Sequence, residues 1–228
     1  MKEYGHWHDK VKIEDKVRIE DADAILVQIV DAALADTARR SGEWLVCRPG
    51  CTQCCTGVFA ISQLDAQRLR NGFAALEQPG ATEEEQARAE RIHTRVTESV
   101  GRLAAEFPGN AASGVLFEAD SAEEQEDFEA RFEDFANDEV CPVLDPATGT
   151  CDLYAARPMT CRTFGPPVRD ESGGLAVCEL CFNGASDEEI AACEMVPDPD
   201  GLEGKMDEQL EAATGARGQT LVAFALRG

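Results

Sequence analysis

The sequence predicts a mainly α-helical fold, a small helical domain in which two cysteine-rich loop blocks come together. Apolar residues recur every three or four positions in several segments, which is the period of one helix face. A serine or threonine followed three residues later by an acidic side chain opens most of these segments, and Pro-Gly pairs end two of them. With 43% apolar residues over 228 positions, the chain has enough apolar material for a hydrophobic core.

The first predicted helix covers residues 21–41 and ends before Gly42. One face of this helix carries Leu26, Val30, Ala33 and Thr37. Residues 1–20 mix charged and apolar side chains without a clear period, so we expect them to form a partly ordered N-terminal arm.

Two further helices are predicted from their capping residues. Ser62 with Asp65 opens a helix that runs to about Leu76. Thr82 with Glu85 forms a capping box, which opens a long helix. The apolar positions of this long helix are Ala89, Ile92, Val96, Val100, Leu103 and Phe107.

Ser121 with Glu124 caps an acidic helix, which carries one aromatic stripe. The stripe consists of Phe128, Phe132 and Phe135. We interpret it as core packing, because a stripe at helical spacing is typical of a buried face. The interval 78–138 contains no cysteine, and we expect it to be a helical excursion within a single domain over 21–228.

The C-terminal part is less regular. Ser186 with Glu189 caps a short helix, and a loop rich in proline and aspartate follows at 197–201. The apolar run from Thr220 to Leu226 is too short to decide between helix and strand.

Nine of the ten cysteines fall into two blocks. The first block, spaced C-x3-C-x2-C-C and interrupted by a Pro-Gly break that predicts a loop, is Cys47, Cys51, Cys54 and Cys55. The second block is Cys141, Cys151, Cys161, Cys178 and Cys181. Such short gaps bring thiolates close together, as a soft metal ion or an iron–sulfur cluster requires. We interpret Cys193, late in a short helix, as a packing cysteine.

A disulfide scaffold is the alternative for a cysteine-rich chain, but it is typical of short secreted domains. The N-terminus has no apolar signal-peptide region, and no apolar run reaches the roughly 18 residues of a membrane span. We therefore expect a cytoplasmic protein, in which clustered cysteines indicate metal more often than disulfides. The net charge of −23 argues against nucleic acid and anionic membranes as partners, because both are polyanions.

Cys54 and Cys55 are adjacent, and two neighbouring cysteines cannot easily chelate one tetrahedral ion because their side chains diverge. Nine clustered thiols also exceed the four that one zinc ion or one cubane cluster uses. Two metals, or one cluster with spare thiols, both remain open. Arg157 and Arg162 lie inside the second block with Tyr154, and we expect the arginines to donate hydrogen bonds to sulfur and offset its charge.

This pattern resembles the CxxCxxCC cysteine-cluster family of the YkgJ type, whose name describes zinc or iron chelation. The matching residues are Cys51, Cys54, Cys55, Cys141-Pro142, Cys151, Tyr154, Arg157-Pro158, Cys161-Arg162 and Phe164, with Cys178 or Cys181 as a further cysteine. Three residues separate Cys47 from Cys51, where the family usually has two. A similar cysteine pattern occurs in flagellin lysine methylases.

The resemblance implies metal binding, and the expected function is a cytosolic protein that chelates zinc or an iron–sulfur cluster through its clustered cysteines. The surplus of thiols and the two arginines favour the iron–sulfur cluster. Two alternatives remain: a cluster-dependent protein-modifying enzyme similar to the lysine methylases, and a metal carrier or sensor with reactive thiols. The sequence assigns no catalytic residue, substrate or protein partner.

Overall fold

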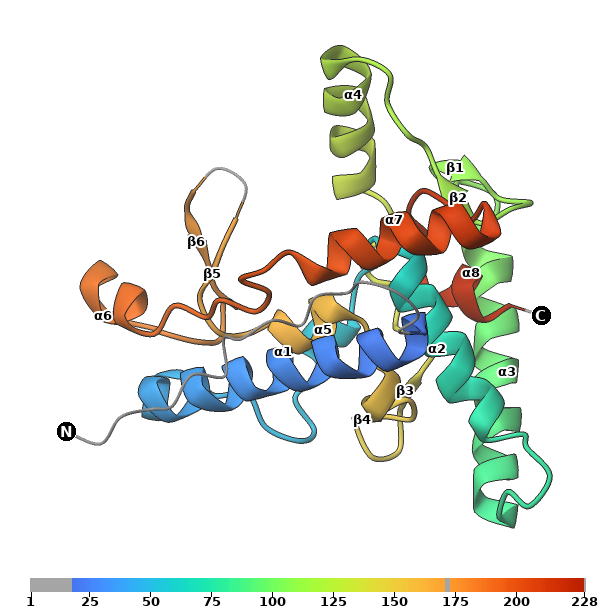
Figure 1. The fold of residues 1–228 in the computed structure, drawn as a ribbon, viewed down its shortest axis with the longest axis horizontal. Helices are drawn as coiled ribbons and strands as arrows, with labels where there is room; N and C mark the ends of the chain where they lie inside the picture. The colour runs from blue at the N-terminus through green and yellow to red at the C-terminus, as the bar shows by residue number, and fades with distance from the viewer. Residues whose placement is uncertain (1–17, 171–172, 228) are drawn as a thin grey trace.

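The computed structural model describes residues 18–170 and 173–227, and it confirms the prediction of a mainly α fold (Figure 1). The helices are α1 Ile19–Ser41, α2 Gln63–Ala75, α3 Glu83–Leu103, α4 Ala122–Glu133, α5 Met159–Thr163, α6 Asp187–Ala192, α7 Leu202–Thr214 and α8 Val222–Leu226. Most of the predicted N-terminal arm, residues 1–17, lies outside the described residues. Helix α1 starts two residues before the predicted position.

Short hairpins and 3-10 turns connect the helices. The antiparallel pairs are β1 Gly109–Asn110 with β2 Val115–Leu116, β3 Leu144–Asp145 with β4 Thr150–Cys151, and β5 Val168–Arg169 with β6 Leu175–Ala176. The 3-10 turns are η1 Gly42–Trp44, η2 Gln53–Cys55 and η3 Tyr154–Ala156. Both cysteine blocks lie in these irregular parts or in the short helix α5.

The four helix starts predicted from capping residues are confirmed, because each depends on a local hydrogen bond. The Ser62 hydroxyl accepts from the backbone N–H of Asp65 at 3.1 Å at the start of α2. A complete capping box opens α3, and another opens α6 at Ser186. Helix α1 ends as predicted at Gly42, whose φ of 52° suits a residue without a side chain.

One part of the core lies between α2, α3 and α8. Leu69 of α2 and Ile92 of α3 are buried there against Val222 of α8. All five residues of α8 are buried, which identifies the undecided C-terminal run as a helix. Helix α3 therefore packs in the main core although it belongs to the interval 78–138, whereas α4 projects away from the rest of the chain in Figure 1.

A second part of the core lies between α1 and α7. Leu26 of α1 packs with Met206 and Leu210 of α7, and Met159 of α5 joins them. Our sequence analysis missed α7, whose apolar residues recur every fourth position but whose start has no side-chain cap. Its burial against α1 stabilises it, since most helical stability in proteins comes from packing rather than propensity.

The aromatic stripe, with Phe128 and Phe132 on α4 and Phe135 just after it, packs as expected. Phe128 and Phe132 have ring centroids 5.6 Å apart, and Phe132 lies 6.3 Å from Phe135. All three belong to an apolar cluster with Leu103, at the end of α3, and Phe224. The stripe therefore connects the projecting helix to the core.

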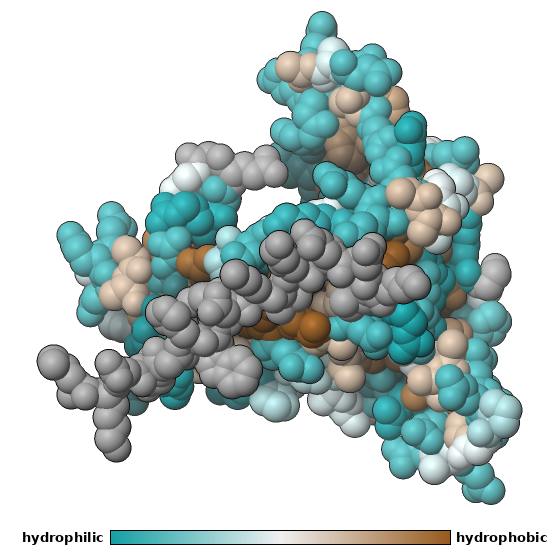
Figure 2. Space-filling view, in the orientation of Figure 1, coloured by the Kyte–Doolittle hydropathy of each residue, from teal (hydrophilic) through white to brown (hydrophobic). Residues whose placement is uncertain are grey.

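The visible face in Figure 2 is mostly hydrophilic, in keeping with the net charge of −23. Within residues 18–170 and 173–227, no helix is long and apolar enough to cross a membrane.

Candidate metal centre

The backbone brings the start of the first cysteine block beside the end of the second. The N–H of Phe182 donates to the carbonyl of Trp44 at 2.9 Å, which joins segments far apart in the sequence. The N–H of Cys181 donates to the carbonyl of Cys178 at 2.8 Å and closes a tight turn. As a result, the sulfurs of Cys47 and Cys181 lie 3.9 Å apart.

We call these neighbouring cysteines the first thiol group: Cys47, Cys51, Cys178 and Cys181. Partial burial and, after it, the nearby thiols of Cys181, Cys51 and Cys178 together raise the pKa of Cys47 to about 12. Burial also raises the pKa of Cys178, with added contributions from Cys181 and Cys51. Cys47 and Cys178 are therefore close enough to the other thiols of the first group for their charges to interact.

The remaining clustered cysteines form the second thiol group: Cys54, Cys55, Cys141, Cys151 and Cys161. The N–H of Cys141 donates to the carbonyl of Cys55 at 2.8 Å. The β3–β4 hairpin then pairs Leu144 with Cys151, and α5 carries Cys161. Both sequence blocks thus contribute to both groups.

The thiols of the second group also shift one another's pKa values. Burial and, to a smaller extent, the thiols of Cys151 and Cys54 together raise the pKa of Cys141 to about 12. The pKa of Cys161 rises through burial and through Cys141, Cys54 and Cys151. The hydrogen bond between the thiols of Cys54 and Cys55 affects the two residues oppositely. It is the main cause that lowers the pKa of Cys54 to about 6, and it raises the pKa of Cys55.

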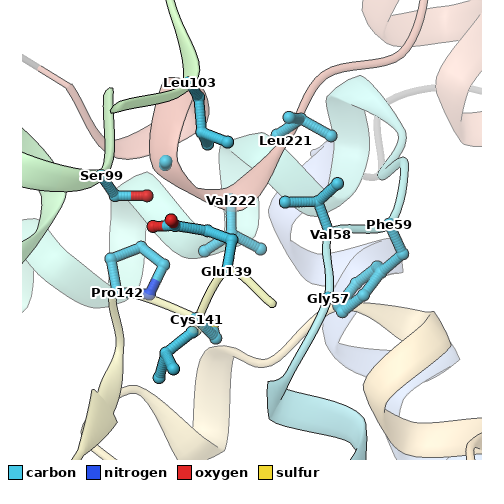
Figure 3. Close-up of a pocket in the computed structure, with 12 residues that line it drawn as sticks. Gly57, Val58, Phe59, Ser99, Leu103, Glu139, Cys141, Pro142, Leu221 and Val222 are labelled. Carbon is cyan, nitrogen blue, oxygen red and sulfur yellow. The ribbon is translucent and has the colours of Figure 1, made fainter. Parts of the chain in front are cut away.

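Both groups face a cavity of about 540 Å³. Eight of the nine clustered cysteines line it, together with Tyr154, Arg157, Arg162 and Phe164. A second cavity behind Cys141, shown in Figure 3 with Ser99 and Glu139 at its wall, measures only about 20 Å³. That volume accommodates about one water molecule, so the larger cavity is the candidate site.

The donor atoms suit zinc or iron, because thiolates are the ligands that both zinc sites and iron–sulfur clusters use. In a tetrahedral site with Zn–S bonds of about 2.3 Å, neighbouring sulfurs lie about 3.8 Å apart. The 3.9 Å separation of Cys47 and Cys181 matches this value. Among the described residues, however, no group of three or more cysteine, histidine or acidic side chains is arranged closely enough to hold a metal ion. Metal binding therefore requires the thiol side chains to move closer together.

Arg162 differs from the expectation that it hydrogen-bonds to sulfur. Its side chain is 1% exposed, and its Nη1 donates to both carboxylate oxygens of Asp31 in α1 at 2.7 and 2.8 Å. Its remaining nitrogens donate to the carbonyls of Ala155 and Arg157. Our sequence analysis missed Asp31, which no motif distinguishes among 44 acidic residues.

Arg157 also bonds to Asp31, at 3.4 Å, and lies over the ring of Tyr154 with its guanidinium carbon 4.0 Å from the centroid. Its positive charge nevertheless acts on the thiols, because it helps to lower the pKa of Cys54 and opposes the rise that burial causes in the pKa of Cys151. Arg157 therefore supports the second group by charge.

Asp65 of α2, which the sequence analysis identified only as the capping partner of Ser62, also positions α5. Asp65 is 2% exposed and accepts the N–H of Met159, the first residue of α5, at 3.0 Å. Arg68 donates to Asp65 and also to Asp23 of α1. This buried network connects α1, α2 and the helix that carries Cys161.

Comparison with known proteins agrees with this arrangement. A family model described as "CxxCxxCC: Putative zinc- or iron-chelating domain" matches residues 46–182, more than half of the chain. The chain belongs to the CxxCxxCC family. The resemblance found in the sequence is thereby confirmed, and this member's matched region contains all nine clustered cysteines. No curated protein and no solved structure matches the chain.

Proposed function

We propose that this protein is a cytoplasmic metal-binding protein whose nine clustered cysteines hold an iron–sulfur cluster or zinc. The observation that carries the proposal is the convergence of thiols from both sequence blocks on one cavity. Metal bound there joins residues far apart in the chain, so it acts as a folding element as well as a ligand. The acidic surface is consistent with a metal as partner rather than nucleic acid or an anionic membrane.

We favour an iron–sulfur cluster in the second thiol group. This group has more thiols than one ion uses, and Arg157 offsets the charge of its sulfurs. Such a cluster supplies one-electron redox chemistry when bound. In this proposal Arg157 and Tyr154 border the cluster, and Arg162 positions the second block through Asp31. We also propose that residues 21–228 form one domain, in which the interval 78–138 links the two blocks.

Metal analysis of anaerobically purified protein tests this proposal. We expect at least one equivalent of metal per chain, with iron, acid-labile sulfide and a broad visible absorption from sulfur-to-iron charge transfer. Less than about a tenth of an equivalent of iron plus zinc would contradict metal binding altogether. A colourless protein loaded with zinc alone would retain metal binding and reject the iron–sulfur cluster.

A second candidate function, a metal carrier or sensor, is favoured by the partly exposed Cys54, whose pKa is lowered to about 6. A carrier needs a reactive thiolate that can exchange ligands at neutral pH. We expect Cys54 in metal-free protein to react with iodoacetamide roughly tenfold faster at pH 7 than an ordinary cysteine, since the thiolate is the nucleophile. Its rate should fall as the pH drops through about 6.

Replacement of the hydrogen-bond donor provides the matched test. In Cys55→Ala, the pKa of Cys54 should rise and its alkylation at pH 7 should slow, because the stabilising hydrogen bond is lost. Peptide mass spectrometry identifies the labelled residue. Equal rates at Cys54 in both proteins would count against an activated thiol and against the carrier function.

A further inference from the structure

The two thiol groups are spatially distinct although both line one cavity. In the first group, Cys178 and Cys181 lie in an apolar cluster with Phe182, and the sulfur of Cys181 is 3.9 Å from that of Cys47. In the second group, Cys141 and Cys151 pack against a different apolar cluster, the one between α2, α3 and α8. We infer that the two groups form two separate metal centres, and that the first is a tetrahedral site for a single zinc-class ion; this inference rests on the proposed metal binding.

The first group has the construction of a four-thiolate zinc site. Two short chelating loops, Cys47-x3-Cys51 and Cys178-x2-Cys181, supply two ligands each, which is the spacing of structural zinc sites. The hydrogen bond from Phe182 to Trp44 holds the two loops together. The sulfurs of Cys47 and Cys181, one from each loop, lie 3.9 Å apart, which is close to the sulfur–sulfur distance in a tetrahedral zinc site.

Two of the four thiols in the first group are buried, which favours a structural site, whereas Cys47 is exposed and Cys51 is half-buried. Cys178 and Cys181 are 5% and 4% exposed and lie in an apolar cluster with Phe182 and Trp44. Four thiolates complete the coordination of zinc and leave no position for a substrate. An ion there would fasten the 178–182 turn to the chain that follows α1.

The second group is built differently. Its ligands come from η2, the start of the second block, strand β4 and α5, rather than from two chelating loops. The N–H of Cys141 donates to the carbonyl of Cys55 at 2.8 Å, and Cys141 and Cys151 pack against the same apolar cluster. The group's five thiols exceed the four that one centre uses, and because Cys54 and Cys55 are adjacent, one of these two remains as a spare thiol beside it. The turn η2 begins between Cys51 and Cys54, which separates the two groups within the first block.

Paired variants of the full-length protein, purified anaerobically, test the inference. Cys178→Ser/Cys181→Ser should lose about one equivalent of zinc-class metal and keep the metal of the second group. Cys151→Ser/Cys161→Ser should do the reverse. The matched control is Cys193→Ser, because Cys193 lies buried in the same apolar cluster as Cys178 and Cys181 but belongs to neither group. It should keep the full metal content of the wild type.

The outcomes separate this inference from the proposed function. Wild-type protein without metal overturns the proposed function itself. A different result overturns only the two-centre inference. This is the case if the wild type holds metal but either double variant loses all of it, or if Cys178→Ser/Cys181→Ser loses none.

A measurement on the wild type covers the case in which a variant does not fold. Slow removal of zinc by a chelator, followed by alkylation and peptide mass spectrometry, reports which thiols become free together. We expect the four cysteines of the first group to be labelled in one step, separately from the second group. Labelling of both groups in the same step contradicts two centres.

Discussion

Arg68→Met is expected to lower the free energy of unfolding by about 3–5 kcal/mol at pH 7.5, the usual cost of removing one partner of a buried ion pair. Arg68 is 7% exposed and donates to both Asp65 and Asp23. Its removal leaves the carboxylate of Asp65 buried. Among the described residues, the N–H of Met159 is then the one hydrogen-bond donor left to that carboxylate. Urea unfolding followed by circular dichroism measures the loss.

The destabilisation should depend on pH in a definite direction. Burial raises the pKa of Asp65 above its ordinary value, whereas Arg68 opposes this rise. Without Arg68 the pKa rises further, so the folded variant takes up a proton at a higher pH than the unfolded chain. The loss of stability is therefore largest above this raised pKa and shrinks as the pH falls below it.

Arg70→Met is the matched control, since Arg70 lies two residues away on α2 and has no ion pair or hydrogen bond within the described residues. A change within about 0.5 kcal/mol is expected for it. If Arg68→Met cost no more than this control, or cost the same at pH 5 and pH 7.5, the buried network would not stabilise the fold as argued.

Arg162→Ala is expected to cost about 3 kcal/mol of unfolding free energy and to weaken metal retention. The guanidinium of Arg162 bonds to Asp31 and to two backbone carbonyls in the second block, one of which is that of Ala155. The carboxylate of Asp31 is 46% exposed, so solvent can partly replace that bond. The carbonyl of the buried residue Arg157 and the cavity left by a large side chain account for most of the cost.

Arg39→Ala provides the contrast, because Arg39 lies on α1, the helix that also carries Asp31. Arg39 pairs with Asp36 at 2.7 Å, but both side chains are exposed. Such a pair contributes less than about 1 kcal/mol. Thermal unfolding and the rate of metal release to a chelator should change strongly for Arg162→Ala and little for Arg39→Ala. Equal behaviour of the two variants would show that Arg162 does not hold the second block in place.

Arg162→Lys separates charge from geometry. Lysine keeps the positive charge, but its single ammonium cannot reproduce the planar fork that reaches Asp31 and the carbonyls together. We expect this variant to recover less than half of the lost stability. Full recovery would assign the role of Arg162 to charge alone.

The sequence by itself determined the features that depend on near neighbours in the chain. Helix starts at Ser62, Thr82, Ser121 and Ser186 could be predicted because a capping side chain bonds only three residues ahead. The family and its metal chemistry could be predicted because they depend on the identity and spacing of cysteines. The stripe on α3 was predicted from periodicity, although its last member, Phe107, lies beyond the helix.

The tertiary structure alone decided which distant residues meet. It divided the thiols of each block between two groups, since hydrogen bonds such as that from Phe182 to Trp44 join chain segments by routes that spacing does not encode. It supplied Asp31 and Asp65 as partners of the arginines, and it stabilised α7 and α8 by burial. These outcomes depend on packing between elements remote in sequence, where many equivalent residues compete and only the folded core selects among them.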